Sequence, residues 1–484
     1  MEGFNVIKQL SVLVLFVFSM FFSTLSLSSE MPETIRGSLC VVKADDKMVL
    51  VKEILTNKIS LPGGTIDPGE APSLTAQRET WEETGLVVTV GDVLGYTETA
   101  VIYDCISDSE VIAYDYPNKL NANEIPIWFA PHYGIEVSNA MLLSPDRLAN
   151  EQYRYPEQWD EIKGMYSRAT DQPVTFVRDL IDAAPLLNQP QLNWIVSLQQ
   201  WVSSLPMAAE QTINSVNFVL SQINKPWLLL VLFPLVLWRF GNAFAYKLFF
   251  AITVSSLLSL VAQQGFNLAR PQAYFPMFEF STSHGFGFPN LSIAVWFSSF
   301  ILLWRELNLE IRKAATLCFS AVMLLLMISK FYSGTAFIWD SLFGAVLGAL
   351  VGWHIIRLEG KADVDLPSTL RSKGVWISLS VVTVALSVIW PLPTLSYWLA
   401  VLITISGLVI TFDSREQNVE LYKAIGIVVF LLGLNVIINL VASLVSYSSI
   451  WSLVLEAIRY PIIMLGYFYL VLKLSKCRSV TTKT

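Results

Sequence analysis

The sequence is poor in charge, in cysteine and in histidine. Only 15% of its 484 residues are charged, against about a quarter in an ordinary soluble domain, and the mean hydropathy is +0.52. These values exclude a chain that is soluble throughout and indicate that much of it lies in a membrane. Cysteine occurs four times and histidine three times, as His132, His284 and His354.

The charge that is present is divided unevenly. Residues 30–190 carry 26 acidic and 12 basic side chains, a net charge of −14, and the rest carry 13 acidic and 20 basic, a net charge of +7. We expect the acidic half to be soluble, and its charge argues against non-specific binding of nucleic acid or anionic lipid. The other half carries its basic residues in short loops between apolar runs.

Two of the cysteines, Cys40 and Cys105, fall in the acidic half. They could form a disulfide if that half is exported. Two buried free thiols in strands are the alternative, which we favour at this point because sequence alone does not show that the two residues meet.

The N-terminus has the pattern of an export signal. Lys8 precedes an apolar run from about residue 10 to 27, with small residues at its end. Residues 1–29 are therefore predicted to be a signal peptide or an uncleaved membrane anchor. In either case we expect the following residues outside the cytoplasm.

Short β-branched runs and one helical segment occupy residues 32–165. This mixture predicts an α/β or α+β domain of ordinary size. Residues 166–225 are also polar, but the spacing of Trp194, Ile195 and Trp201 indicates amphipathic helix. We predict a connector that lies on the membrane surface; a helical edge of the soluble domain is the alternative.

Nine apolar runs of spanning length, or close to it, fill the rest of the chain. Basic residues gather in alternate loops, which places those loops in the cytoplasm. The prediction is a multi-pass protein of the bacterial inner (cell) membrane, with an extracytoplasmic (periplasmic) acidic domain and a cytoplasmic C-terminus. The runs form a first membrane domain over residues 226–360 and four additional transmembrane helices over residues 374–474.

The stretch from Leu61 to Leu86 concentrates glycines and acidic residues. Residues 74–84 lack Gly and Pro and are predicted to form a helix, with Pro72 near its start and Gly85 at its end. On this helix three glutamates fall at positions i, i+3 and i+4 and share one face.

These glutamates are Glu79, Glu82 and Glu83. Their carboxylates repel one another unless a cation or an arginine lies among them. Such oxygen ligands suit Mg²⁺ or Mn²⁺, which also bind substrate phosphate oxygens. Gly63 and Gly64 permit a tight loop that brings backbone against the metal or the phosphate.

The spacing resembles the signature of the Nudix hydrolases, G-x5-E-x7-R-E-U-x-E-E-x-G-U, where U is a bulky apolar residue. Every fixed position matches between Gly64 and Leu86, and the preceding Leu61-Pro62-Gly63 is typical of the family. The departure is Thr80 at an apolar position, which we expect to affect helix packing more than chemistry.

The resemblance implies an α/β Nudix sandwich (α/β/α) over residues 32–165 that cleaves a diphosphate linked to another moiety. A folded domain that has lost activity, or a merely solvated acidic helix face, are the alternatives. The residues implied to hold Mg²⁺ or Mn²⁺ are Gly64, Glu79, Glu82 and Glu83. Arg78 is implied to orient the glutamates, and Glu70 is implied to hold Arg78 in place.

The apolar half carries a second resemblance, in "FNLARPQAY", "STSHGFGFPNLSIAVWF" and "SKFYSGTAFIWDSLFGAVLGALVGW". In order and spacing these stretches resemble the motifs of the type 2 phosphatidic acid phosphatase superfamily, K-x6-R-P, P-S-G-H and S-R-x5-H-x3-D. That family dephosphorylates lipid phosphates, including undecaprenyl diphosphate, through a nucleophilic histidine.

This second match fails at the catalytic positions. Gln263 stands at the lysine, Ser292 at the proton-donating histidine and Ala336 at the nucleophilic histidine. A phosphohistidine cannot form on alanine, so we expect the all-α polytopic membrane fold without histidine-based catalysis.

A pocket for a lipid phosphate could nevertheless remain, and a structural anchor with leftover charges is the alternative. The residues predicted to line this pocket are Arg270, His284, Lys330 and Asp340.

The sequence thus predicts a membrane-anchored Nudix hydrolase that cleaves a nucleoside diphosphate derivative or a lipid-linked diphosphate. Its predicted partners are a phosphorylated small molecule or lipid and the bilayer, and no nucleic acid. The alternatives are a lipid phosphate phosphatase or undecaprenyl-diphosphatase acting through the membrane domain, and a non-catalytic phospholipid sensor.

Overall fold

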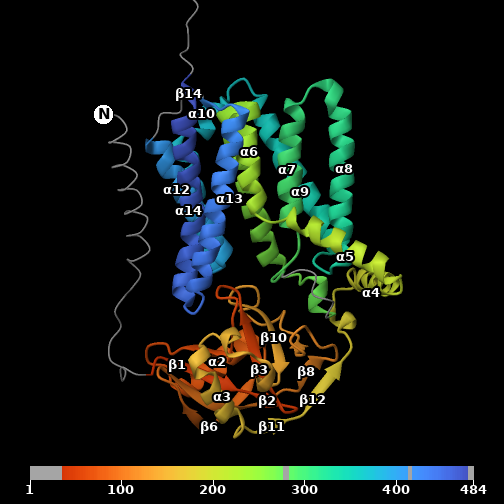
Figure 1. Cartoon of the computed structure of the whole chain (residues 1–484), viewed down its shortest axis with the longest axis vertical. Helices are drawn as coiled ribbons and strands as arrows, with labels where there is room; N and C mark the ends of the chain where they lie inside the picture. Colours follow the sequence, from red (N-terminus) through yellow and green to blue (C-terminus); the bar gives the residue numbers. More distant parts are fainter. Residues whose placement is uncertain (1–34, 276–282, 412–416, 478–484) are drawn as a thin grey trace, which may run out of the picture.

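The computed structural model describes residues 35–275, 283–411 and 417–477. The predicted signal or anchor segment, residues 1–29, lies outside these residues. Figure 1 shows a strand-rich domain at one end of a bundle of long helices. We call the bundle, residues 227–477, the helical half.

Strands dominate the first part of the chain, where short β-branched runs alternate with turn residues. They are β1 (Gly37–Val41), β2 (Lys43–Ala44), β3 (Lys47–Glu53), β4 (Ile59–Ser60), β5 (Gly63–Thr65), β6 (Val88–Tyr96), β7 (Ala100–Ser107), β8 (Val111–Tyr114), β9 (Asn123–Ile125), β10 (Val137–Leu143), β11 (Asp171–Gln172) and β12 (Val174–Val177). One mixed sheet has the order β5-β1-β7-β6 and a second has the order β11-β2-β3-β10-β9, with β4 also on β3. A further pair joins β8 and β12.

Two helices, α2 (Pro72–Thr84) and α3 (Trp159–Tyr166), cover different apolar clusters of this domain. Val51 of β3 packs in the cluster that includes Ala76 of α2, and Leu50 packs in the cluster that includes Trp159 of α3. Consecutive residues of a strand point to opposite faces, so β3 serves both clusters. The predicted α/β/α sandwich followed by an all-α part is confirmed. Short 3₁₀ turns complete the domain at Pro145–Arg147, Asn150–Gln152, Pro156–Gln158 and Ile181–Ala183.

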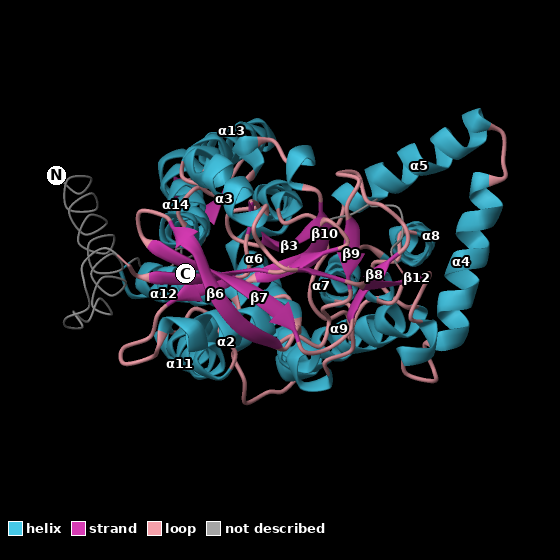
Figure 2. Ribbon diagram, turned by 90° about the horizontal axis from the view of Figure 1, so that it is seen from below, coloured by secondary structure: helices cyan, strands magenta, loops and turns pink. Residues whose placement is uncertain are grey.

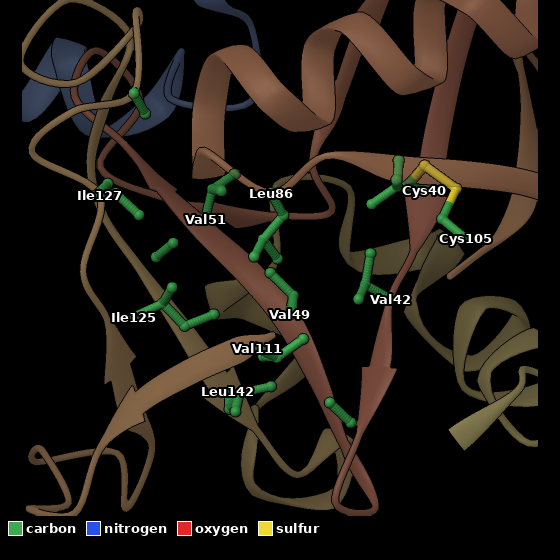
Figure 3. Packing of buried hydrophobic residues seen from close by; sticks show 14 of the residues in the cluster. Cys40, Val42, Val49, Val51, Leu86, Cys105, Val111, Ile125, Ile127 and Leu142 are labelled. Atoms are coloured by element: carbon green, nitrogen blue, oxygen red, sulfur yellow. A yellow bond between two sulfur atoms is a disulfide. The ribbon is translucent and has the colours of Figure 1, made fainter. Parts of the chain in front are cut away.

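Cys40 in β1 and Cys105 in β7 form a disulfide, with Cα atoms 5.5 Å apart. Both lie in the buried cluster drawn in Figure 3. Strands β1 and β7 are parallel neighbours, with Cys40 opposite Tyr103. The interpretation as two free thiols is therefore wrong, because strand pairing brings together residues that are 65 positions apart.

Residues 166–225 divide between the two parts of the molecule. Strands β11 and β12 pair with β2 and β8 of the first domain. Helices α4 (Gln189–Ser203) and α5 (Met207–Gln222) follow and project to the side of the bundle, as Figure 2 shows. On α4, Leu192 and Ile195 are buried, whereas Trp194 and Trp201 are exposed.

The helical half contains long apolar helices. They are α6 (Trp227–Phe266), α7 (Leu291–Glu306), α8 (Leu309–Tyr332), α9 (Ile338–Glu359), the short α10 (Leu366–Leu370), α11 (Lys373–Ile389), α12 (Pro393–Thr411), α13 (Leu421–Leu444) and α14 (Ser449–Leu474), with the 3₁₀ turn Pro271–Ala273 and the strand pair β13 (Gln417–Asn418) and β14 (Lys476–Cys477).

Helix α6 turns back on itself at Gly241, whose φ of 80° and ψ of 179° are not helical. The rings of Phe233 and Phe249 lie 5.9 Å apart, whereas a continuous helix would separate their backbones by about 24 Å. Glycine tolerates this backbone conformation. The single element α6 therefore comprises two antiparallel helices, at the places of the first two predicted spans.

Six of the described helices are long and apolar enough to cross a membrane, namely α6, α8, α9, α12, α13 and α14. Helices α7 and α11, of 16 and 17 residues, are shorter. The C-terminal ends of α7, α9 and α14, which hold Arg305, Arg357 and Lys473, lie at the end of the bundle away from the first domain (Figure 1).

Candidate active site and metal centre

Helix α2 begins and ends at the predicted residues. Pro72 occupies the first turn, where no backbone N–H is needed. Gly85 ends the helix with a φ of 72° and donates its N–H to the carbonyl of Trp81. A Cβ at Gly85 would lie 2.3 Å from the Phe129 ring, so conformation and space both require glycine.

Arg78 lies among the carboxylates on the exposed side of α2. Its Nε and Nη2 donate to the two carboxylate oxygens of Glu70 at 3.0 and 2.9 Å. Its Nη1 donates to Glu79 Oε1 at 2.8 Å and to Glu82 Oε2 at 2.9 Å. The hydrogen bonds from Arg78 lower the pKa of Glu70 to about 2, and those to Glu70 raise the pKa of Arg78. The guanidinium is thus held in one orientation between three carboxylates.

Glu79 and Glu83 are buried beside the glycine turn. Glu83 Oε2 accepts a hydrogen bond from the N–H of Gly63 at 3.0 Å. Burial raises the pKa of Glu79 and raises that of Glu83 well above its ordinary value. A Cβ at Gly64 would lie 2.4 Å from the carboxyl group of Glu79. Residue 64 therefore has to be glycine for the turn to lie against that carboxylate.

A second segment, between β9 and β10, adds groups that the sequence motif does not contain. The N–H of His132 donates to the carbonyl of Glu82 at 2.8 Å. Its Nε2 lies 3.7 Å from Glu82 Oε2 and its Nδ1 lies 3.5 Å from Glu136 Oε2. The negative charge of Glu136 also acts on Glu79 and Glu83. Neither residue is predicted from the sequence as part of the site, because both follow the motif by about 50 positions without a pattern of their own.

The side chains around α2 fit a divalent cation. Oxygen or nitrogen atoms of Glu79, Glu82 and His132 lie within 4.8 Å of one another. The Nδ1 of His132 is buried and has no hydrogen-bond partner in the part of the chain that the structure describes. The buried carboxylate of Glu79 and the half-buried groups of Glu82 and His132, with a surplus of negative charge, form a donor set suited to a hard cation.

The NUDIX domain family matches residues 34–161. Those residues form a Nudix domain. It is a hydrolase domain that acts on diphosphate bonds. Nudix hydrolases generally use divalent metals, in keeping with the acidic group on α2.

Two solved structures are similar to the Nudix domain. One is an ADP-ribose pyrophosphatase from Streptococcus suis, 20% identical, which covers 29% of this chain and 97% of its own, with a TM-score of 0.21. The other is a MutT protein from Methanosarcina mazei, also 20% identical, which covers 28% of this chain and 99% of its own, with a TM-score of 0.18. No curated protein matches the chain.

The helical half brings its predicted residues together next to the Nudix domain. Arg270 donates from Nε to the carbonyl of His284 at 3.3 Å, from Nη1 to that of Thr335 at 2.7 Å and from Nη2 to that of Phe286 at 3.0 Å. The His284 side chain itself is exposed. The guanidinium of Arg270 thus links its own loop to the backbone around residues 284–286 and to that at Thr335.

The other predicted groups of this cluster differ in their surroundings. Asp340 is buried, and its Oδ2 accepts the N–H of Phe337 at 2.9 Å. Lys330 is half-buried, and no hydrogen bond of its ammonium group occurs among the described residues. Ala336 is only 1% exposed. Gln263, at the lysine position, donates to the carbonyl of Pro289 at 2.8 Å.

Proposed function

We propose that the chain is a membrane-anchored Nudix hydrolase that cleaves a diphosphate bond with the help of Mg²⁺ or Mn²⁺. The observation that carries this proposal is the carboxylate group on α2, in which Arg78 contacts Glu70, Glu79 and Glu82. A solvated acidic helix face would not bury its glutamates, whereas Glu79 and Glu83 are buried.

Glu79, Glu82 and Glu83, with the carbonyl of Gly64, would hold the metal. A bound divalent cation neutralises charge on the phosphates and lowers the pKa of a water molecule that attacks phosphorus. Arg78 keeps the glutamates apart and oriented, and the bidentate contact with Glu70 fixes Arg78.

His132 is the group we assign to proton transfer. It lies between Glu82 and Glu136, so its ring is held at the edge of the carboxylate group. In this proposal the glutamates and the Gly64 carbonyl hold the metal and the imidazole does not, so the imidazole can accept the proton that the attacking water loses.

The Nudix domain is proposed to work outside the cytoplasm, at the bacterial inner (cell) membrane. The disulfide between Cys40 and Cys105 supports this, because disulfides persist in oxidising compartments. The basic helix ends at the far end of the bundle support a cytoplasmic location for that end and for the C-terminus.

A second function is considered for the helical half, namely binding of a phosphorylated lipid without catalysis. Lys330 and Asp340 lie near Arg270, as in the pattern of the type 2 phosphatidic acid phosphatases, and Lys330 donates to no described acceptor. Catalysis as a lipid phosphatase or undecaprenyl-diphosphatase is disfavoured, since Ala336 offers no nucleophile and is buried. Lys330→Gln should weaken capture on polyprenyl phosphate beads; unchanged capture would contradict this second function.

The test of the main proposal is hydrolysis by the purified full-length protein. With Mg²⁺ or Mn²⁺ it should release phosphate or a monophosphate from at least one member of a panel of diphosphates. Glu82→Gln combined with Glu83→Gln should reduce turnover by about 10³-fold or more, the range expected when metal ligands are lost. Glu161→Gln, an exposed glutamate of α3, is the matched control.

Two results would contradict the proposal. Turnover that survives the double change but disappears with Asp340→Ala would move the activity to the helical half. Absence of turnover on every diphosphate, by protein that still binds Mn²⁺, would favour the non-catalytic sensor.

A further inference from the structure

The loop that completes the Nudix centre also contacts the helical half. It comprises residues 131–136, with His132 against Glu82. Two residues later Gly134 meets Gly285, so closely that a Cβ at Gly134 would lie 2.5 Å from the Cα of Gly285. Ile135 packs against an apolar cluster of α6, α11 and α12. The centre therefore lies at the boundary between the domain and the helices.

A second contact places the other side of the centre at the same boundary. Glu53, at the end of β3, acts electrostatically on the buried Glu83. Its Oε1 accepts a hydrogen bond from Arg154 Nη1 at 2.8 Å, and Arg154 Nη2 donates to Ser449 Oγ at 2.7 Å. Ser449 is the first residue of α14. The carboxylate group is thus linked to the helical half on two sides: through Glu53 and Arg154 to the start of α14, and through the loop of His132 to Gly285 and the cluster that contains Ile135.

A cavity of about 620 Å³ opens between the Nudix domain and the ends of α13 and α14. Thr56 lines it and donates to Glu53 Oε2 at 2.7 Å, so the cavity is adjacent to the Glu53 carboxylate. Three of its lining residues are lysines, Lys52, Lys58 and Lys119, and the helical side contributes Ser443 and Ser446.

The charge of this cavity suits a phosphate group. Two glutamates, Glu151 and Glu456, also line it, and the carboxylate of Glu456 is paired with Arg459. The three lysines therefore outnumber the acidic side chains of the lining. Lysine ammonium groups attract phosphate oxygens. The ends of spanning helices lie at the depth of the lipid head groups, where a phosphorylated lipid keeps its charge while its hydrocarbon remains in the bilayer.

We propose that the substrate of the Nudix centre is a lipid-anchored diphosphate, which enters at the bilayer surface through this cavity. The inference rests on the proposed function and names its substrate class. In the reaction, water adds its oxygen to one phosphorus while the P–O bond of the bridging oxygen breaks. The bond electrons stay on the departing phosphate, and the proton of water passes to the centre's base. The products are a lipid monophosphate and a phosphate or phosphate monoester.

The test compares matched lipid and soluble diphosphates with the full-length protein in phosphatidylcholine vesicles. The pairs are CDP-diacylglycerol with CDP-glycerol, and a long-chain prenyl diphosphate with isopentenyl diphosphate. We expect kcat/KM for at least one lipid member to exceed that of its soluble counterpart by about tenfold or more.

Equal or better turnover of the soluble members would overturn the lipid substrate and leave the proposed function in place. Turnover of neither pair, by protein that hydrolyses another member of the diphosphate panel, would overturn the lipid substrate alone; absence of turnover on the whole panel would overturn both.

A variant of the cavity separates its role from that of the centre. Lys52→Gln with Lys58→Gln should raise KM for the preferred lipid member by about tenfold, as for the loss of one charge-assisted contact. It should change kcat/KM for CDP-glycerol by less than about twofold. Lys52→Gln alone is the second variant, because Lys58 donates to the carbonyl of Glu151 and its loss also affects packing.

The control is Lys163→Gln on α3, where Lys163 is paired with Asp160. An unchanged KM in both cavity variants would overturn the entry route.

Discussion

The two clusters of charged side chains in this chain differ in what their arginine contacts. In the Nudix domain, Arg78 contacts three carboxylates. In the helical half, Arg270 contacts three backbone carbonyls, and the position of a nucleophile is the buried Ala336. Carboxylates that are hydrogen-bonded to an arginine can give up part of that hydrogen bonding and bind a metal cation instead, and the cation can in turn bind a phosphate. An arginine that donates only to backbone carbonyls holds loops in place. The two arginines therefore differ in role: we assign Arg78 to the proposed reaction and Arg270 to the stability of the fold.

The largest effect is expected from the disulfide, which acts on the Nudix domain alone. Cys40→Ser with Cys105→Ser should lower the free energy of unfolding by about 4 kcal/mol, the value for a closed loop of this length. Denaturant unfolding in detergent, followed by fluorescence, measures this. Cys318→Ser, which removes the exposed cysteine of α8, is the control and should change little. Equal stability of the paired and unpaired forms would contradict the prediction.

A single methyl group tests the glycine turn of the centre. Gly64→Ala puts a Cβ 2.4 Å from the Glu79 carboxyl, so that carboxylate must move. We expect turnover to fall about 100-fold, equivalent to about 2.7 kcal/mol, together with a weaker affinity for Mn²⁺ by titration calorimetry. Gly164→Ala, where a Cβ meets nothing within 4 Å, should leave both unchanged. Normal metal affinity in Gly64→Ala would show that residue 64 does not shape the site.

Arg270→Gln tests the other side of the comparison. The loss of its backbone contacts should lower the free energy of unfolding by about 2 kcal/mol, measured as a lower midpoint of thermal unfolding. Turnover of CDP-glycerol should fall less than about fivefold. If Arg270→Gln reduced turnover as much as Gly64→Ala, the contrast between a chemical and an architectural arginine would fail.

The smallest effect concerns Glu70 and pH. Its pKa is about 2 in the folded protein, below the ordinary 4.5, so between these values the unfolded chain binds more protons. The contact with Arg78 therefore contributes stability above about pH 4.5, and that stability is lost as the pH falls toward 2. The midpoint of thermal unfolding should decline more steeply from pH 5 to pH 3 in the native protein than in Glu70→Gln. Parallel declines would refute this.

The fold of the Nudix domain and the residues on α2 could be predicted because they lie close together in the sequence. Helical periodicity places Glu79, Glu82 and Glu83 on one face, and the motif positions Gly64 at its start. His132 and Glu136 could not be predicted in this way. They reach the centre only because the loop between β9 and β10 folds against the end of α2, a contact that no local spacing records.

The disulfide and the turn in α6 show the same limit at different scales. Cys40 and Cys105 meet because β1 and β7 are neighbours in one sheet, and strand order cannot be read from either strand. The turn at Gly241 was easier to predict from the sequence, because polar residues interrupt the apolar run there. For Arg270 the family pattern was enough to identify the residue. Its backbone hydrogen-bond partners could not be predicted, because they depend on how the loops fold.

The backbone contact between Gly134 and Gly285 also imposes an order on biosynthesis. Gly285 is added to the growing chain about 150 residues after Gly134, which at about 5–20 residues per second takes about 8–30 s. During that interval the Nudix domain has its own core, which includes Tyr133, but Gly134 and Ile135 have no helical surface to contact. The side of this loop that faces α2 can therefore form with the Nudix core, and only the side that faces the helices is completed after they are made.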